Sequence, residues 1–406
     1  MRKIAFLLVL PFYAVAQGDE IEYTFNGFAD TYHAVRSQSP YDFMSSRSRL
    51  RTEFGATKGK SYLFASVNSV YNGILEEETR IELREVFFKY SGSNWDFKAG
   101  RQIIIWGVAD GLRITDVVSP MDMTEFLARD YDDIRIPVDA FRVKYLKSNL
   151  SAEFVFVPVP SFFIIPDAPD NPWSVFPQSS DPHFEVNMEN TPLKKISNSE
   201  FGGRFSFFLS GIDFSFSALH TWNKMPVFQR SYSTNNDTVF VEAQHNRMDM
   251  VGMDFSFPIR QFVVRGEVAE YFGELQTTTS GNNKVKRNTS NFLLGVDWYP
   301  GNDWTLTFQY SHKLIPDYID KIETKENTVL ATSGITKKVF QNTLSLSTFT
   351  YFDVTNQSFF NRTSADYSLT DEIHMMAGYD WFEGDEGMFG LYKNNSEYWV
   401  KAKFSF

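Results

Sequence analysis

Hydrophobic and polar residues alternate along most of this chain in segments of about ten to thirteen residues, the length of a strand that crosses a membrane. The clearest segments are 212–218, 304–311 and 373–381, where every second residue is apolar or aromatic and most of the others are small or hydrogen-bonding. Strict alternation indicates a strand with one apolar and one polar face. No helical periodicity competes with this pattern over a long stretch.

Further strands are expected at 21–35, 44–57, 60–71, 79–90, 95–106, 133–146, 149–157, 199–209, 245–257, 261–272, 290–299, 338–351 and 357–368, and a last one at 398–406. Tight turns at 58–60, 91–94, 147–149, 210–211 and 300–303 alternate with longer connections, as periplasmic turns and outer loops do in outer-membrane barrels. The total is odd, whereas chain ends on one side require an even number, so we expect one error between 310 and 382. The pattern predicts an all-β, transmembrane, antiparallel up-and-down barrel of about 16 strands, with 14 to 18 possible, and long extracellular loops partly folded inward.

The end of the chain strengthens this interpretation. Tyr398, Val400, Phe404 and Phe406 alternate with polar residues that include Lys401, and the chain stops on an aromatic residue. A terminal strand of this kind closes an outer-membrane barrel and carries its assembly signal. We expect it to pair with the strand near 21–35, with the apolar residues facing lipid and the lysines facing the lumen.

The beginning of the chain has the pattern of a secretory signal peptide. Arg2 and Lys3 precede an apolar stretch at 4–15, and small residues up to Ala16 fit a cleavage site. We therefore expect a signal peptide at 1–16, cleavage near Ala16, and a single outer-membrane barrel domain at 17–406 in a Gram-negative bacterium. The absence of cysteine removes lipoprotein anchors, disulfides and thiolate metal sites.

Composition excludes several other classes of protein. Losing the two positive charges of the signal peptide takes the formal net charge from −11 to −13, which argues against nucleic acid as a partner. No apolar run approaches the roughly 18 residues that a membrane helix needs. Aromatic residues make up 17% of the chain although its mean hydropathy is only −0.29, a combination typical of barrels with aromatic girdles and a wet interior.

Three arginines give the firmest assignment of a strand face. Arg47, Arg49 and Arg51, with Glu53, occupy alternate positions. Each arginine would cost about 2 to 4 kcal/mol on the lipid face at mid-membrane, so this face is expected to line the lumen and to contact permeating solutes. The alternative is that the arginines pair with charges on the neighbouring wall, and the obvious candidates are Arg80, Glu82, Arg84 and Glu85.

The next two expected strands lose their alternation partway. A phase change near Arg84 suggests a β-bulge, and a second bulge at Gly100 would be needed to turn Arg101 into the lumen. Arg80, Arg84 and Arg101 are therefore further candidates for the permeation path.

Two long connections are candidates for segments that enter the lumen. The link 158–198 holds eight of the sixteen prolines together with Phe162, Phe163 and Trp173, and it is either a self-packed surface loop or a lid or constriction that meets a partly apolar substrate. In the link 107–132, Ser119 and Pro120 could start a short helix with Asp122 near its positive end.

The chain carries no recognisable enzyme chemistry. It has no nucleotide-binding loop, no zinc-protease motif and no nucleophile elbow, and its six histidines are scattered. The acidic residues at 380–386 are best explained as a solvated loop. We therefore expect no enzyme activity, no catalytic residues, no cofactor and no metal.

Three stretches resemble a family of Gram-negative outer-membrane barrels of unknown function that is related to the alginate-export porins. They are Gly100-Arg101-Gln102 with Trp106-Gly107, Asp110, Asp116, Pro120 and Asp122; Asn198-Ser199-Glu200-Phe201-Gly202 with Arg204; and Phe382, Gly384-Asp385, Phe389-Gly390 and Asn395-Ser396. The resemblance covers roughly residue 80 to the end and implies work beside an inner-membrane exporter of lipid-like or hydrophobic cargo.

Together these features predict an outer-membrane porin-like channel or exporter for small polar or anionic solutes. Two alternatives are transport of a lipid or other amphiphile with an inner-membrane exporter, and a surface receptor or adhesin. The expected partners are outer-membrane lipid and lipopolysaccharide and the barrel-assembly machinery, with that exporter as a further candidate, but no nucleic acid.

Overall fold

The computed structural model describes residues 20–131, 133–168, 170–174, 176, 183–234, 238–279 and 285–406. The expected signal peptide at 1–16 and its cleavage site near Ala16 lie outside the described residues.

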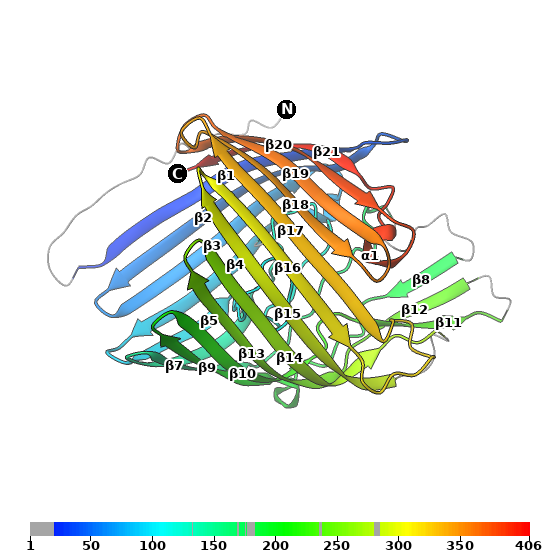
Figure 1. Cartoon of the computed structure of the whole chain (residues 1–406), viewed down its shortest axis with the longest axis horizontal. Helices are drawn as coiled ribbons and strands as arrows, with labels where there is room; N and C mark the ends of the chain where they lie inside the picture. The colour runs from blue at the N-terminus through cyan, green and yellow to red at the C-terminus, as the bar shows by residue number, and fades with distance from the viewer. Residues whose placement is uncertain are drawn as a thin grey trace.

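Eighteen antiparallel strands form one closed sheet (Figure 1). They are β1 (Glu22–Arg36), β2 (Phe43–Lys58), β3 (Ser61–Asn72), β4 (Arg80–Ser91), β5 (Trp95–Gln102), β6 (Val138–Lys147), β7 (Leu150–Val157), β9 (Glu200–Leu209), β10 (Ile212–Trp222), β13 (Arg247–Ile259), β14 (Phe262–Gln276), β15 (Val285–Gly301), β16 (Trp304–Leu314), β17 (Asn327–Val339), β18 (Leu344–Asp353), β19 (Ser358–Ser368), β20 (Ile373–Glu383) and β21 (Glu397–Ser405). The predicted barrel is confirmed, and the preferred count of sixteen is wrong, although eighteen lies within the expected range. We call its two ends the short-turn end, which holds the tight hairpins, and the long-loop end.

The strand count was wrong because β17 was not recognised in the sequence. Its outward positions include Ala331 and Ser333, which face Tyr310 and Phe308 of β16, so the apolar alternation is weak along its length. The strand expected at 338–351 is present as β18 but begins later, at Leu344, because Phe340, Gln341 and Asn342 adopt positive φ angles of 51°, 56° and 70° and turn the chain between β17 and β18. A missing strand, and not a surplus one, explains the odd total.

A small three-stranded sheet, which the sequence did not predict, lies at the long-loop end beside the barrel (Figure 1). It consists of β8 (His183–Asn187), β11 (Val227–Tyr232) and β12 (Thr238–Gln244), and β8 pairs with β12 in parallel. Helices are confined to η1 (Glu76–Glu78), η2 (Ile196–Asn198) and α1 (Gly387–Gly390) among the described residues. None of the described helices has the length and apolar character needed to span a membrane.

The barrel closes where the two terminal strands meet. Strand β21 pairs with β1 from Arg36 opposite Glu397 to Phe28 opposite Ser405, and the backbones of Gly27 and Phe406 exchange two further hydrogen bonds. The expected pairing is therefore present. Val400 is 54% exposed on the outer face whereas Lys401 is 8% exposed on the inner face, as the alternation predicted. The role of this strand in assembly stays a prediction.

Gly27 provides a test of the closing seam. A Cβ at this position would lie 2.2 Å from the Arg51 carbonyl oxygen and 2.8 Å from the Phe406 ring. We expect Gly27→Ala to lower the free energy of unfolding by about 1 to 3 kcal/mol, the usual cost of overpacking. Gly73→Ala is the matched control, because its Cβ meets no atom closer than 3.5 Å. Equal unfolding midpoints of the two variants in denaturant would contradict this description of the seam.

Candidate functional site in the barrel lumen

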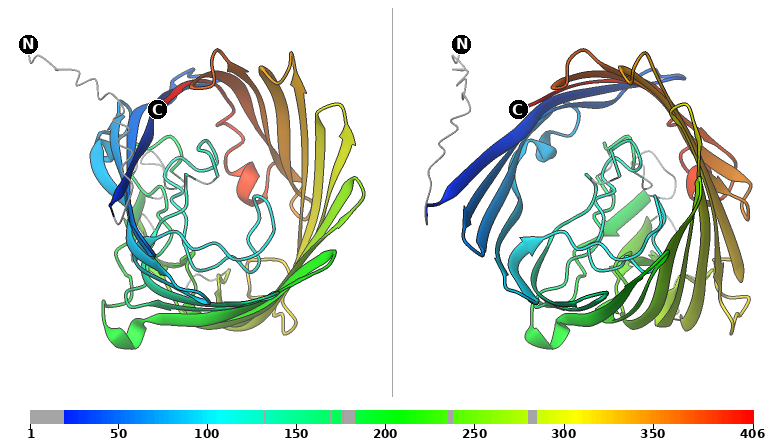
Figure 2. Two further views of the ribbon diagram at one scale, coloured as in Figure 1. Left: turned by 90° about the vertical axis from the view of Figure 1, so that its left-hand side faces the viewer. Right: turned by 60° about the vertical axis from the view of Figure 1, so that its left-hand side comes forward.

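The connection between β5 and β6 runs through the inside of the barrel (Figure 2). We call its residues 103–137 the inserted segment. Strand β5 ends at Gln102, whose buried side-chain amide donates to the Ala140 carbonyl oxygen at 3.0 Å. Gly107 and Gly111 then adopt φ angles of 87° and 73°, so the chain can turn into the lumen at positions where a side chain would be strained.

The first half of the inserted segment is attached to one wall by apolar packing. The buried residues of the segment are Ile104, Trp106, Ile114, Val117 and Val118, and those of the wall include Val155, Val157, Leu219, Met250 and Leu293. The wall residues come from β7, β10, β13 and β15. The inner face of the barrel is therefore apolar where the segment covers it, an exception to the polar lumen that alternation alone predicts.

Glu267 on β14 fixes the turn within this half. Its carboxylate accepts backbone N–H bonds from Val108 at 2.5 Å, Ala109 at 2.7 Å and Thr115 at 2.9 Å. Gly107 lies so close that a Cβ there would approach the Glu267 carboxylate to 2.6 Å. Sequence reasoning missed Glu267, since an isolated glutamate within a strand gives no sign of the backbone it binds.

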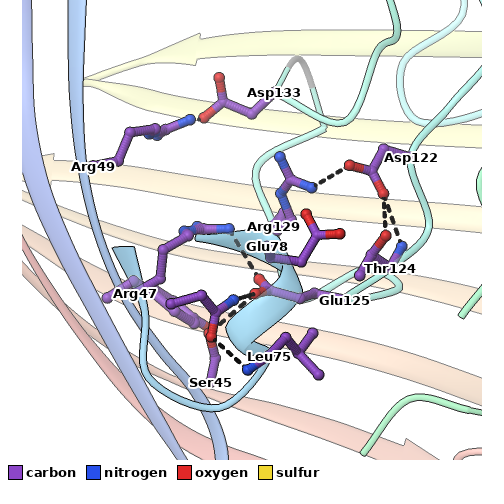
Figure 3. Close-up of polar contacts among 12 residues, drawn as sticks. Ser45, Arg47, Arg49, Leu75, Glu78, Asp122, Thr124, Glu125, Arg129 and Asp133 are labelled. Atoms are coloured by element: carbon purple, nitrogen blue, oxygen red, sulfur yellow. Dashed lines mark hydrogen bonds and ion pairs between the residues drawn. The ribbon is translucent and has the colours of Figure 1, made fainter. Parts of the chain in front are cut away.

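The second half of the segment reaches the opposite wall through the predicted arginines (Figure 3). Arg47 binds Glu125 with 2.9 Å between Nη1 and Oε2. Arg49 binds Asp133 at 2.9 Å, and Arg51 binds the same carboxylate at 3.0 Å. The three arginines are buried, and they hold the inserted segment in place.

The other charged residues on this wall have partners that differ from those expected. Arg49 also binds Asp30 of β1 at 2.6 Å, whereas Arg80 pairs with Glu78 at 2.6 Å. The proposed partnership of the arginines with the 80–85 stretch is therefore wrong, because the carboxylates of the inserted segment and Asp30 take those positions. Glu53 instead accepts a hydrogen bond from Ser66 at 3.4 Å.

One of the two predicted bulges is present. The register of β3 and β4 shifts at Arg84, and its side chain donates to the Asp133 carbonyl oxygen at 3.1 Å. No register shift occurs at Gly100, so Arg101 keeps the outward parity of its partner Val86 and the placement of Arg101 in the lumen is wrong. Arg101 donates instead to the Leu83 carbonyl oxygen at 3.0 Å, beside the bulge.

The acidic residues singled out in the inserted segment bind within it or to the wall. Asp116 pairs with Arg135, and Asp122 binds Arg129 at 2.8 Å and Thr124 at 2.6 Å. Asp110 binds Arg265 of β14 at 2.7 Å. No helix starts at Ser119, whose hydroxyl accepts the Ile104 N–H at 3.0 Å. The chain bends there and then forms a bridge between Met121 and Arg135.

The proline-rich link packs onto the inserted segment. Ile164 forms a parallel bridge with Asp122, and Phe162 packs against His245 with ring centroids 4.0 Å apart and the rings tilted by 41°. Phe163 lies under the Arg113 guanidinium. Trp173 is buried among Phe126, Phe382 and Tyr392. The aromatic residues of this link therefore contact the lumen segment as well as neighbouring loops, which favours an inward-folded constriction over a self-packed surface loop.

Two of the cavities beside the inserted segment are large enough for a small solute. One, of about 490 Å³, lies between the turn at 107–111 and β18, with Tyr131, Arg135, Phe349 and Tyr351 in its lining. The other, of about 240 Å³, lies against β6, β7, β9, β10 and β13. Val108 lines both, so the two cavities adjoin the same point of the inserted segment.

Two carboxylates of the inserted segment, Asp133 and Asp130, resist protonation. Burial raises the pKa of Asp133, but Arg49 and Arg51 outweigh this effect and hold its pKa well below the usual range. Lys401 likewise outweighs burial and lowers the pKa of Asp130. A carboxylate with a lowered pKa stabilises the folded state above its unfolded pKa, about 3.9, and loses that contribution only as the pH falls through the lower folded value.

We therefore expect these pairs to keep the segment docked in mild acid. Single-channel conductance in planar bilayers should stay constant between about pH 7 and pH 4.5, because Asp130 and Asp133 remain ionised in this window. A conductance step with a midpoint between about pH 5 and pH 7 would contradict this expectation.

Comparisons with known proteins agree with the barrel. A family model described as "Protein of unknown function (DUF1302)" matches residues 35–389, while no protein with a curated description matches the chain. The match confirms the expected family of unknown function. The relation to alginate-export porins stays a prediction.

Solved barrels from Pseudomonas aeruginosa have a similar fold. OccK3 (OpdO) gives a TM-score of 0.56 at 9% identity over 95% of this chain and 96% of its own. OpdL gives 0.55 at 8% identity over 95% and 99%, and OccD3 (OpdP) gives 0.54 at 11% identity over 95% and 91%. The chain thus has the fold of an outer-membrane porin barrel.

Proposed function

The chain belongs to the family described as "Protein of unknown function (DUF1302)", and we propose that it is an outer-membrane porin-like channel for small polar solutes. The observation that carries this proposal is a closed barrel of eighteen strands whose lumen is crossed by the inserted segment (Figure 2). Barrels of this size leave an aqueous channel unless they are filled. Here the filling leaves the two cavities of about 490 and 240 Å³.

Uncharged polar residues support passage of polar solutes. Inward-facing positions on β16 to β19 carry Thr307, Gln309, Thr332, Ser347 and Ser364, and Gln309 binds Thr332 at 2.9 Å while Ser347 binds Ser364 at 2.8 Å. Such groups replace the hydrogen bonds of a hydrated solute without repelling either sign of charge.

The arginines support only weak preference for anions. Glu125, Asp133 and Asp30 neutralise Arg47, Arg49 and Arg51, so these guanidiniums attract mobile anions less than unpaired ones would. The arginines therefore act in this proposal as the docking site of the inserted segment, and solutes pass on its other side.

Purified protein in planar bilayers tests the proposal. We expect discrete single-channel currents in potassium chloride, with permeability to chloride and potassium within about a factor of three of each other. Liposomes holding the protein should also swell in arabinose. Absence of both currents and swelling would overturn the proposal.

A second candidate rests on the larger cavity. Ile105, Phe349 and Tyr351 line it, and Ile105 is 53% exposed. These apolar surfaces suit the tail of a lipid or other amphiphile passing through the lumen, and native mass spectrometry would reveal such a molecule as a bound mass. A lumen that carries only water and ions would count against this alternative.

The receptor or adhesin alternative rests on the sheet of β8, β11 and β12, and binding to intact cells would test it. Contacts with lipopolysaccharide, the barrel-assembly machinery and an inner-membrane exporter stay predictions.

A further inference from the structure

The cavity of about 240 Å³ has a distinctive arrangement of charge. Its lining includes five charged side chains, namely Lys144, Glu153, Arg204, Asp213 and Asp254. They come from β6, β7, β9, β10 and β13 in that order around the wall. Positive and negative charges alternate from β6 to β10, and β13 adds a further carboxylate. Lys144 lies directly opposite Glu153, and Glu153 lies directly opposite Arg204.

Ion pairs keep this row in place. Lys144 Nζ lies 2.7 Å from Glu153 Oε2. Arg204 Nη2 reaches across β10 to both carboxylate oxygens of Asp254, at 2.8 and 2.9 Å. The side chains of Glu153 and Asp254 are only 6% and 3% exposed. These four paired charges sum to zero, and Asp213 adds one negative charge to the lining.

Contacts from the inserted segment and from hydroxyl groups complete the lining. Trp106 Nε1 donates to the Glu153 carboxylate at 3.0 Å, and Ser215 donates to Ser206 at 3.0 Å. The buried Nε of Arg204 has no hydrogen-bond partner among the described residues. The hydrogen-bonding capacity of Arg204 is therefore incompletely used, although both of its charged neighbours are fixed.

We infer that this cavity binds small zwitterionic solutes, which are the substrate class of the channel proposed above. A solute with one sign of charge meets both cations and carboxylates in this lining, so attraction to one set is offset in part by repulsion from the other. A solute that carries an ammonium and a carboxylate group can place each one against the opposite member of the row. At roughly 30 Å³ per water the cavity holds about eight water molecules, which is room for an amino-acid-sized solute.

Three probes of matched size test this inference, namely β-alanine, propionate and propylammonium. Each is added to wild-type channels in planar bilayers, and the concentration that halves the potassium chloride current is measured. We expect β-alanine to act at a concentration about tenfold lower than the other two, the effect of one additional charge-assisted hydrogen bond. Arg204→Gln should raise the β-alanine value to that of propionate.

Arg230→Gln is the matched control, because Arg230 lies on β11 outside the barrel and its nearest carboxylate, on Glu323, is 3.9 Å away. Its half-blocking concentrations should equal those of the wild type. Should Arg204→Gln fail to fold, as judged by heat-modifiable migration in gels, Asp254→Asn removes the other end of the row and should have the same effect.

The outcomes separate the inference from the proposed function. Wild-type currents with equal block by the three probes, or undiminished β-alanine block in Arg204→Gln and Asp254→Asn, would overturn the zwitterion site and leave the channel standing. Absence of current in the wild type would overturn both.

Discussion

Replacing residues 108–131 by a flexible Gly-Ser linker is expected to raise the single-channel conductance several-fold, on the order of fivefold, because a barrel of this size without a filling segment leaves a wide aqueous channel. The deleted residues include the turn that Glu267 binds and the Glu125 side chain that Arg47 binds. Conductance in planar bilayers measures the effect directly.

The control for this deletion removes residues 227–244 in the same way. These residues hold β11 and β12, which lie outside the barrel (Figure 1), so the conductance should match that of the full chain. An equal increase in both variants, or none in the deletion of 108–131, would show that the inserted segment does not narrow the path.

Reversing one charge of the docking site is expected to release the segment. In Arg47→Glu a second carboxylate faces Glu125, and the two original side chains are only 9% and 4% exposed. Breaking a buried pair in this way costs about 3 to 5 kcal/mol. We expect flickering currents with added high-conductance levels and a lower unfolding temperature.

The charge-swapped variant Arg47→Glu/Glu125→Arg distinguishes loss of the pair from a general defect. It should restore most of the steady current, because opposite charges again face each other. Arg230→Glu, in the three-stranded sheet of β8, β11 and β12, should give the same currents and unfolding temperature as the wild type. If the charge-swapped variant does not restore the steady current although Arg47→Glu gives flickering currents, Arg47 acts through contacts other than Glu125.

The barrel itself was predictable because alternation is a local property. Each strand buries one face in lipid, so residues such as Phe308 and Tyr310, both outward and exposed, mark their strand without knowledge of its neighbours. Strand β17 was the exception, since Ala331 and Ser333 leave its outer face nearly featureless.

The contacts in the lumen were only partly predictable, because alternation is a local property of the sequence. The inward direction of Arg47, Arg49 and Arg51 follows from the cost of placing charge in lipid, whereas their partners Glu125 and Asp133 lie more than seventy residues further along the chain. No local pattern connects the two sets. The lumen position predicted for Arg101 was wrong because it required a bulge at Gly100, whereas the register of β5 is regular there.

The most direct test is to lock the inserted segment where the structure places it. The chain has no cysteine, and the side chains of Ser45 and Glu125 are 3.4 Å apart, so a Ser45→Cys/Glu125→Cys variant can be joined by a short bifunctional thiol reagent. We predict efficient cross-linking in the folded protein and a single-channel conductance equal to that of the wild type. Failure to cross-link, or a cross-link that abolishes the current, would contradict a channel whose path runs beside the docked segment.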